Sequence, residues 1–201
     1  MCKAYIEEIK KKNMPKTMEN AISIANEMIE KLNITEMPVD ITYILTRLGF
    51  KIYVIDDLKD NISGLIYVSP DLKDRFQTDK IIMLNERDKR GRQRFTLAHE
   101  FSHYIFDFNY NTMTEYVDTY DTNKSNNEDE KICSRFAAEL LIPKKLFEKK
   151  VKELYEKGVD RYSFVEQLVD YFDVSVKSIR KRFDELSEDL PSDIKSFCST
   201  I

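Results

Sequence analysis

The spacing of apolar residues predicts helices alternating with short strands in the first half of the chain. Apolar side chains recur every three or four positions in residues 17–32 and 41–48, as they do in amphipathic helices. Three later stretches, 50–55, 62–68 and 80–85, are instead rich in β-branched and aromatic residues and are bounded by turn residues, as strands are. We therefore expect a small mixed or antiparallel sheet packed on helices.

The second half is predicted to be mainly helical. A broad apolar face runs through residues 126–143, which open with asparagines that cap helices well. Helical stripes recur in 164–172 and 176–186, on either side of a tight turn. Residues 109–127 contain almost no aliphatic side chains, and we interpret them as a long mobile loop, either a lid or a tolerated insertion. The predicted fold class is α+β, with a helical C-terminal segment.

Composition narrows the class of protein. The 201 residues are 42% hydrophobic and 34% charged, as in a soluble globular protein with a proper core. The net charge of −4 gives no general attraction to nucleic acid. The first residues lack an apolar run of signal-peptide length and no stretch approaches a membrane span, so we expect a cytoplasmic protein. Three cysteines are too few for a disulfide framework, and we expect reduced thiols.

Both histidines of the chain lie in His99-Glu100-Phe101-Ser102-His103, the H-E-x-x-H pattern. Residues four apart share one face of a helix, so His99 and His103 can present two imidazole nitrogens to one Zn²⁺. Glu100 would then lie beside the metal as a general base, because a carboxylate can take a proton from a water that the metal has made acidic. The alternative is a half-buried, hydrogen-bonded histidine pair on an amphipathic helix.

A third ligand is expected from the first turn of the helix predicted at 126–143. Small residues along that helix would let it approach the motif helix closely. Glu130 is our first choice, Glu128 and Asp129 are weaker candidates, and the Cys133 thiol ranks below all three. Two histidines and a glutamate with an open fourth position form the catalytic type of zinc site.

Three further features have two interpretations each. Asp107, one turn beyond His103, would either orient that imidazole or remain an exposed residue at a helix end, and we favour the exposed residue. The basic run at 86–94 would hold a polar substrate or form a solvated loop, and we favour the loop.

The two helices around residue 174 could form a helix-turn-helix whose second helix carries basic residues, but acidic neighbours favour a role without DNA contact. Those basic residues are Lys177, Arg180, Lys181 and Arg182.

Several stretches together resemble the ImmA/IrrE family of bacterial and phage-associated metallopeptidases. Residues 92–103 resemble its basic F-T-L-A-H-E-x-x-H segment, and residues 130–143 resemble its E-x-x-A-x-x-F-A-x-x-L-L-x-P signature. With similar segments at 38–55 and 171–175, the resemblance covers residues 36–187. The departures are Cys133 in place of the usual alanine, Phe101-Ser102 in place of an aliphatic-glycine pair, and a longer 109–127 segment.

The resemblance implies a zincin-like metallopeptidase with zinc bound by His99, His103 and Glu130 and with Glu100 as the catalytic base. It further implies a protein substrate, a helix-turn-helix repressor whose cleavage releases transcription of phage, mobile-element or stress genes. We divide the chain into an N-terminal helical segment at 1–35, the metallopeptidase core at 36–145 and a C-terminal helical segment at 146–201 packed on that core.

Two rival functions remain at this stage. In the first, the metal is structural and the chain is a non-catalytic module that binds a partner protein or DNA through its C-terminal helices. In the second, the chain hydrolyses a small amide. Metal binding without cleavage of any protein would favour the first, and turnover of small amides without any peptide substrate would favour the second.

Overall fold

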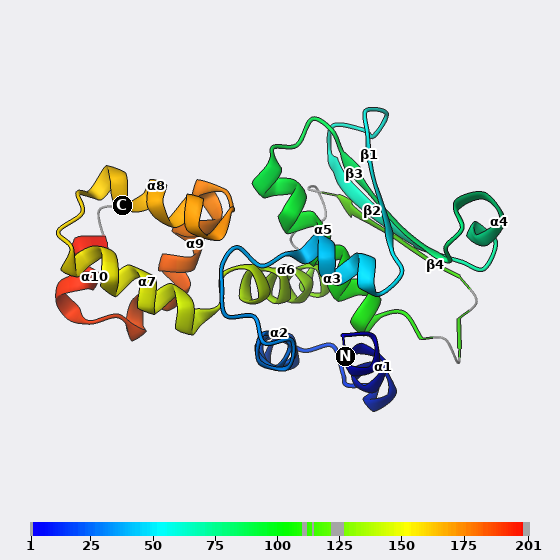
Figure 1. Cartoon of the computed structure of the whole chain (residues 1–201), viewed down its shortest axis with the longest axis horizontal. Coiled ribbons are helices and arrows are strands. Elements are labelled where there is room, and N and C mark those ends of the chain that lie inside the picture. The colour runs from blue at the N-terminus through cyan, green and yellow to red at the C-terminus, as the bar shows by residue number, and fades with distance from the viewer. Residues whose placement is uncertain (1, 110–111, 114, 122–126, 199–201) are drawn as a thin grey trace.

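A computed structural model describes residues 2–109, 112–113, 115–121 and 127–198 (Figure 1). The α-helices are α1 (Cys2–Lys12), α2 (Met18–Lys31), α3 (Ile41–Arg47), α4 (Leu72–Phe76), α5 (Arg90–Phe106), α6 (Glu128–Leu141), α7 (Lys144–Glu156), α8 (Arg161–Phe172), α9 (Val176–Leu186) and α10 (Ser192–Cys198), with a 3₁₀ turn, η2, at Ser187–Asp189. The strands are β1 (Lys51–Ile55), β2 (Ile62–Val68), β3 (Lys80–Asn85) and β4 (Tyr116–Asp121). The predicted α+β class is confirmed.

The four strands form one mixed sheet in the order β1-β3-β2-β4. Strand β1 runs parallel to β3, whereas the β3–β2 and β2–β4 pairs are antiparallel. This order leaves β4 at one edge of the sheet. Helix α5 packs against β2, β3 and β4, so the motif helix lies beside the edge strand.

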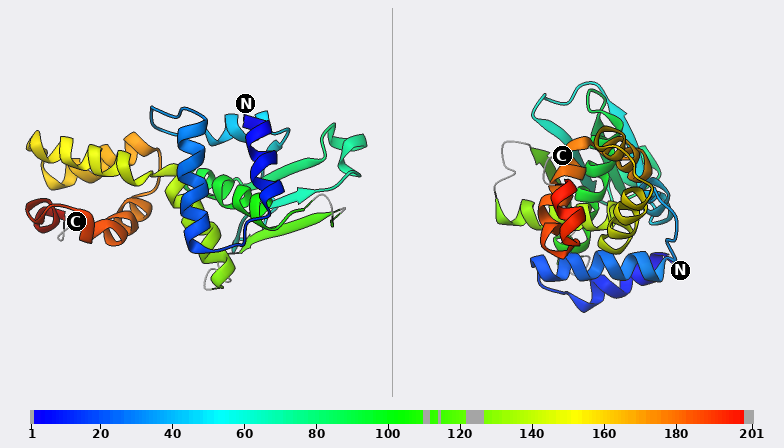
Figure 2. Two further views of the ribbon diagram at one scale, coloured as in Figure 1. Left: turned by 90° about the horizontal axis from the view of Figure 1, so that it is seen from below. Right: turned by 90° about the vertical axis from the view of Figure 1, so that its left-hand side faces the viewer.

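Helix α5 is buried along most of its length and holds the core together. Every side chain from Thr96 to Ile105 is buried, because the sheet covers one side of the helix and α6 covers another. The sheet comes very close at Gly64 of β2, where a Cβ atom would lie 2.6 Å from Thr96 Cγ2. On the far side, α2 packs on α6 (Figure 2). The motif therefore lies in the buried core of the molecule.

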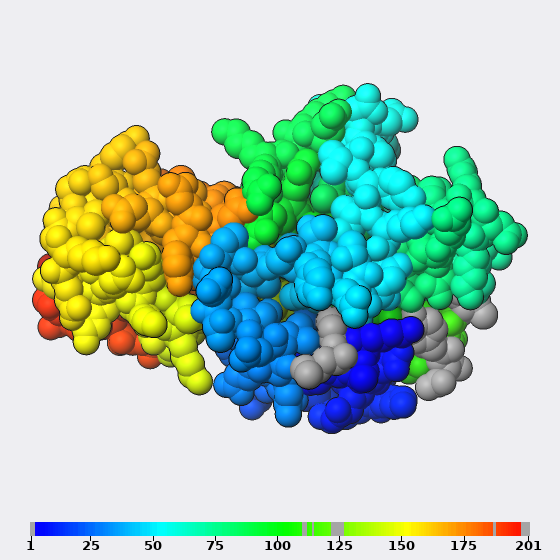
Figure 3. All heavy atoms as spheres, in the orientation of Figure 1, coloured from blue at the N-terminus to red at the C-terminus, as the bar shows by residue number. Residues whose placement is uncertain are grey.

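Helices α7 to α10 gather at one end of the molecule, beyond α6, and form a separate lobe in the space-filling view (Figures 2 and 3). An ion pair of 2.6 Å between Glu139 of α6 and Arg182 of α9 joins this lobe to the core.

A second contact between the lobe and the core lies where the first turn of α5 meets the turn between α8 and α9. At Gly91 a Cβ atom would lie 2.8 Å from the carbonyl carbon of Val174, so only glycine fits there. The exact domain boundaries stay a prediction.

Two sequence-based interpretations were wrong. The segment 109–127 is not a loop throughout, because residues 116–121 form strand β4, which pairs with β2. Residues 110–111, 114 and 122–126 of this segment lie outside the described part of the chain. The basic run at 86–94 is not a solvated loop either, since α5 already begins at Arg90. Its Arg94 is buried and donates to the carbonyl of Val39, so part of this charge serves tertiary contacts.

No helix in the described ranges has the length and apolar character needed to cross a membrane.

Candidate metal centre

Helix α5 presents the two motif histidines on one buried face. The spacing of four residues brings His99 Nε2 within 3.2 Å of His103 Nε2. Both side chains are almost completely buried. Burial lowers the pKa of His99 to about 4, so its ring is neutral at physiological pH and has a lone pair to offer.

Helix α6 supplies a carboxylate to the same point. Asn127 caps its first turn by accepting from Asp129 N–H, and Cys133 and Ala137 are small enough to let the helix pack tightly on α5. This packing places Glu130 Oε2 3.1 Å from His99 Nε2 and Glu130 Oε1 3.6 Å from His103 Nε2. Of the three acidic residues in that turn, only Glu130 is buried.

The three side chains have the composition and spacing of a zinc site. One ligand atom each from His99, His103 and Glu130 lies within 4.8 Å of the other two. Two imidazoles and a carboxylate are the ligands that catalytic zinc takes, with a fourth position left open. The chemistry of these groups therefore fits the metal that the sequence predicted. The same distance criterion also admits a second group, His103, Asp107 and Cys133, which shares His103 with the first.

Glu100 lies next to the metal-ligand group without a partner of its own. Its side chain is fully buried, and neither carboxylate oxygen has a hydrogen bond of ordinary geometry to any described residue. Burial raises the pKa of Glu100 to about 8, although the positive charge on His103 partly opposes this shift. Glu100 can therefore hold a proton near neutral pH, as a carboxyl group that passes protons must.

Two aspartates orient His103 from behind. Its Nδ1–H lies 2.7 Å from Asp107 Oδ2 and 2.9 Å from Asp118 Oδ2, so Nε2 is the nitrogen that faces Glu130. Burial lowers the pKa of His103, but the two carboxylates outweigh it and raise the pKa to about 12. A metal ion at Nε2 would take the place of the proton there. The preferred interpretation of Asp107 as an exposed helix-end residue was wrong, because its side chain is partly buried against His103. The sequence gave no indication of Asp118.

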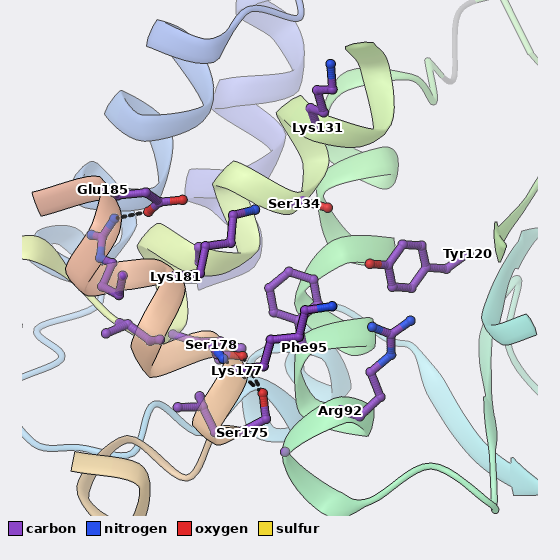
Figure 4. A pocket seen from close by; sticks show the side chains of 16 residues that line it. Arg92, Phe95, Tyr120, Lys131, Ser134, Ser175, Lys177, Ser178, Lys181 and Glu185 are labelled. Carbon is purple, nitrogen blue, oxygen red and sulfur yellow. Dashed lines mark hydrogen bonds and ion pairs between the residues drawn. The ribbon is translucent and has the colours of Figure 1, made fainter. Parts of the chain in front are cut away.

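Strand β4 contributes a further neighbour that the sequence did not indicate. The ring of Tyr120 stacks on His99 with a centroid distance of 3.9 Å, and Ser134 Oγ lies 3.4 Å from His99 Nδ1. Both residues also line a cleft of about 360 Å³ between α5, α6, β4 and α9 (Figure 4). The cleft therefore lies beside His99, separated from it by Tyr120 and Ser134.

Comparison with known proteins places the chain in a family. A sequence model of the IrrE N-terminal-like domain (Peptidase_M78) matches residues 45–184, which include the whole H-E-x-x-H motif and Glu130. The solved structure of a Mycobacterium tuberculosis transcriptional regulator shares the fold with a TM-score of 0.54 at 16% identity. That match covers 89% of this chain and 51% of the regulator, so the chain spans about half of its length. No curated protein matches. The chain belongs to the IrrE N-terminal-like family of peptidases, as its resemblance to ImmA/IrrE proteins predicted.

Proposed function

We propose that the chain is a zinc-dependent endopeptidase that binds Zn²⁺ through His99, His103 and Glu130 and uses Glu100 as its general base. One observation carries the proposal: three side chains that can bind a metal converge in the core beside a fully buried carboxylate whose oxygens make no hydrogen bond of ordinary geometry within the described residues. A structural metal site needs no such carboxylate, whereas hydrolysis does.

The reaction follows from what these side chains can do. Zinc bound at this point supplies Lewis-acid chemistry, which makes water acidic and a carbonyl electrophilic. Glu100 accepts the proton of the attacking water as its oxygen bonds to the carbonyl carbon. Glu100 then donates that proton to the amine nitrogen as the C–N bond breaks, which leaves an acid and an amine. The Tyr120 hydroxyl and the Arg92 guanidinium face the cleft beside His99 and are the donors at hand for the oxyanion (Figure 4).

A peptide is the substrate that this environment fits best. Strand β4 is the edge of the sheet and carries Asp118 and Tyr120 toward the histidines. An extended peptide can pair with the main chain of an edge strand, which would bring a backbone carbonyl near the metal-ligand group. The resemblance to ImmA/IrrE proteins supports a helix-turn-helix repressor as the natural substrate, which would place the reaction in the cytoplasm.

The second candidate is a non-catalytic regulatory module with a structural metal. It is favoured by the burial of the group, since Glu130, its most exposed member, is only 8% exposed. Substrate access therefore requires some movement around the site, whereas a structural metal does not. The partnerless Glu100 is what leads us to prefer the enzyme.

The first test is the zinc content of the purified chain, compared with Glu130→Ala. We expect about one zinc per chain in the wild type and a large loss of zinc in the variant, because a site with two remaining protein ligands holds the metal weakly. Glu128→Ala is the matched control, because Glu128 is an exposed acid in the same helical turn. It should keep the full zinc content.

Three results would count against the proposal. If Glu128→Ala loses zinc equally, Glu130 is not the ligand. If zinc is absent after reconstitution, the peptidase mechanism fails. If zinc binds at full occupancy but no protein is cleaved, including a repressor encoded beside this chain, the regulatory module becomes the better assignment.

A further inference from the structure

The cleft beside the metal-ligand group has a basic lining. Five of the residues around it carry positive charge: Arg92, Lys131, Lys177, Lys181 and Arg182. Arg182 is ion-paired with Glu139 and Glu185, and the other four are labelled in Figure 4. The whole chain has a net charge of −4, so this positive charge is local to the cleft and does not reflect overall composition. A concave site lined by charges of one sign concentrates ligands of the opposite sign.

These charges are only partly neutralised by the protein itself. Lys177 and Lys181 form no ion pair or hydrogen bond within the described ranges, and both are exposed. The one acidic residue that lines the cleft, Glu185, lies 2.5 Å from Arg135 Nη1 and 3.1 Å from Arg182 Nη1, so it is already paired. A ligand that enters the cleft therefore meets at least two lysines that have no counterion.

The floor of the cleft has a different character. Phe95, Leu141, Ile142 and Val174 contribute apolar surface between the charged rims. Figure 4 shows the Phe95 ring near the centre, with the end of the Lys177 side chain beside it. A cavity of about 360 Å³ with an apolar floor accommodates a few amino-acid side chains. A nucleic acid duplex, whose major groove alone is about 12 Å wide, is too large to enter the cavity and would meet only the rim.

We infer that this cleft binds the part of the substrate on one side of the scissile bond, and that it selects acidic side chains there. The inference rests on the proposed peptidase function and adds a substrate class to it. Because Tyr120 and Ser134 belong both to the cleft and to the surroundings of His99, a peptide held in the cleft lies beside the metal-ligand group and reaches it once the residues around the site move.

The inference also assigns a role to the helix pair that the sequence likened to a helix-turn-helix. In the structure the second helix of that pair, α9, forms a wall of the cleft, with Lys177 and Lys181 one turn apart on the lining face. Arg180 lies on the same helix but outside the cleft lining, and it is exposed. It is therefore a matched control for changes of charge on α9.

The test begins with binding, so that it does not depend on turnover. Two fluorescein-labelled decapeptides, one with three glutamates and the other with glutamines in their place, are titrated by anisotropy against zinc-loaded Glu100→Gln protein. We expect the acidic peptide to bind more tightly at low salt. Lys177→Glu/Lys181→Glu in the same background should weaken its binding about tenfold, because two attractions become repulsions. Arg180→Glu should change the affinity less than about twofold.

Cleavage is measured next, with Glu100 present. Wild type, Lys177→Glu/Lys181→Glu and Arg180→Glu are each incubated with a tryptic peptide library, and the cleaved positions are read by mass spectrometry. We expect Asp and Glu to be enriched on one side of the cleaved bond for wild type and Arg180→Glu. That enrichment should disappear in the double variant, which should keep its zinc and still cleave neutral peptides.

The outcomes separate the inference from the proposed function. Cleavage without acidic preference, or binding of both decapeptides with equal affinity, overturns the inference and leaves the peptidase intact. Tight, selective binding of the acidic peptide without any cleavage by wild type supports the acidic selectivity and removes the endopeptidase function. If the double variant loses affinity for a 20-base-pair DNA duplex and not for the acidic peptide, the lysines serve nucleic acid and the inference is wrong.

Discussion

Helix α6 contributes a buried carboxylate to each of two charge clusters, and the two clusters are built in different ways. Near its C-terminal end, Glu139 lies 2.6 Å from Arg182 Nη2 and accepts from the backbone N–H of Lys144 at 3.2 Å. Arg182 also reaches Glu185, which pairs with Arg135 at 2.5 Å. Each carboxylate in this cluster therefore faces an arginine, which is the arrangement that a buried charge needs to be stable.

Near the start of α6, Glu130 belongs to a cluster in which no arginine or lysine faces its carboxylate within the described residues, and the nearby positive charge is that of His103. Its neighbours are two imidazoles, and the fully buried Glu100 beside them has neither an ion pair nor a hydrogen bond of ordinary geometry within the described residues. A buried carboxylate without a cation costs free energy, so a fold retains it only where a cation or a reaction uses it. The contrast is what we expect if the α6–α9 cluster is structural and the α5–α6 cluster is the proposed metal centre.

The largest expected effect comes from changing the partnerless carboxylate. Glu100→Gln keeps the shape of the side chain but cannot accept a proton. We expect cleavage of a peptide substrate to fall by about 10²- to 10⁴-fold, which is the usual contribution of a general base. Zinc content and the midpoint of unfolding of the zinc-loaded protein should stay close to wild type. The measurement is kcat/KM together with zinc per chain.

Glu128→Gln serves as the control for this variant, because it makes the same chemical change at an exposed position of α6. It should leave kcat/KM unchanged. Equal activity of Glu100→Gln and wild type would remove Glu100 from the mechanism. Loss of zinc from Glu100→Gln would instead mean that Glu100 helps to hold the metal, and the distinction between ligand and base would fail.

A change in the α6–α9 cluster should lower the stability of the fold and leave zinc binding intact. Arg182→Met leaves Glu139 buried without its closest cation, and we expect the free energy of unfolding to fall by about 3–5 kcal/mol. Zinc binding by the folded fraction should persist, because the metal ligands are on α5 and at the other end of α6. Denaturant unfolding monitored by circular dichroism, with zinc titration below the transition, measures both quantities.

Two companion variants sharpen this result. Arg180→Met, on the exposed side of the same helix, should change the free energy of unfolding by less than about 0.5 kcal/mol. Arg182→Met/Glu139→Gln should recover part of the lost stability, because the buried negative charge disappears together with its partner. If Arg182→Met is as stable as wild type, the cluster does not stabilise the fold and the comparison between the two ends of α6 breaks down.

The residues of the α5–α6 cluster could be found in the sequence because each depends on local geometry. His99 and His103 are four apart on one helix, and Glu130 lies in the first turn of the next long helix. Helical periodicity predicts both facts. Asp107 could be suggested for the same reason, since it lies four residues beyond His103. Which metal binds, and whether it binds at these three residues, stays a prediction.

The neighbours on β4 could not be found in this way. Asp118 and Tyr120 lie in a stretch with few aliphatic residues, which reads as a loop. Pairing with β2, more than forty residues earlier in the chain, makes the stretch a strand and aims both side chains at the histidines. Such non-local contacts leave no periodic pattern in the sequence. For the same reason, the sequence showed the lysines of α9 but not the cleft that they line.

The last expected effect concerns the stability of the metal-free chain and isolates the cost of burying Glu100. Its pKa is about 8 in the folded chain, against an ordinary value of 4.5, so between these pH values the folded state holds a proton that the unfolded state has lost. The free energy of unfolding must therefore fall as the pH rises through this window. Glu100→Gln lacks the titrating carboxyl group. In the presence of a chelator, the free energy of unfolding of Glu100→Gln minus that of wild type should therefore increase from pH 5 to pH 8 and stay constant at higher pH. Urea unfolding at each pH measures this difference, and Glu128→Gln should follow wild type throughout. Parallel curves for Glu100→Gln and wild type would mean that Glu100 has found a partner in solution.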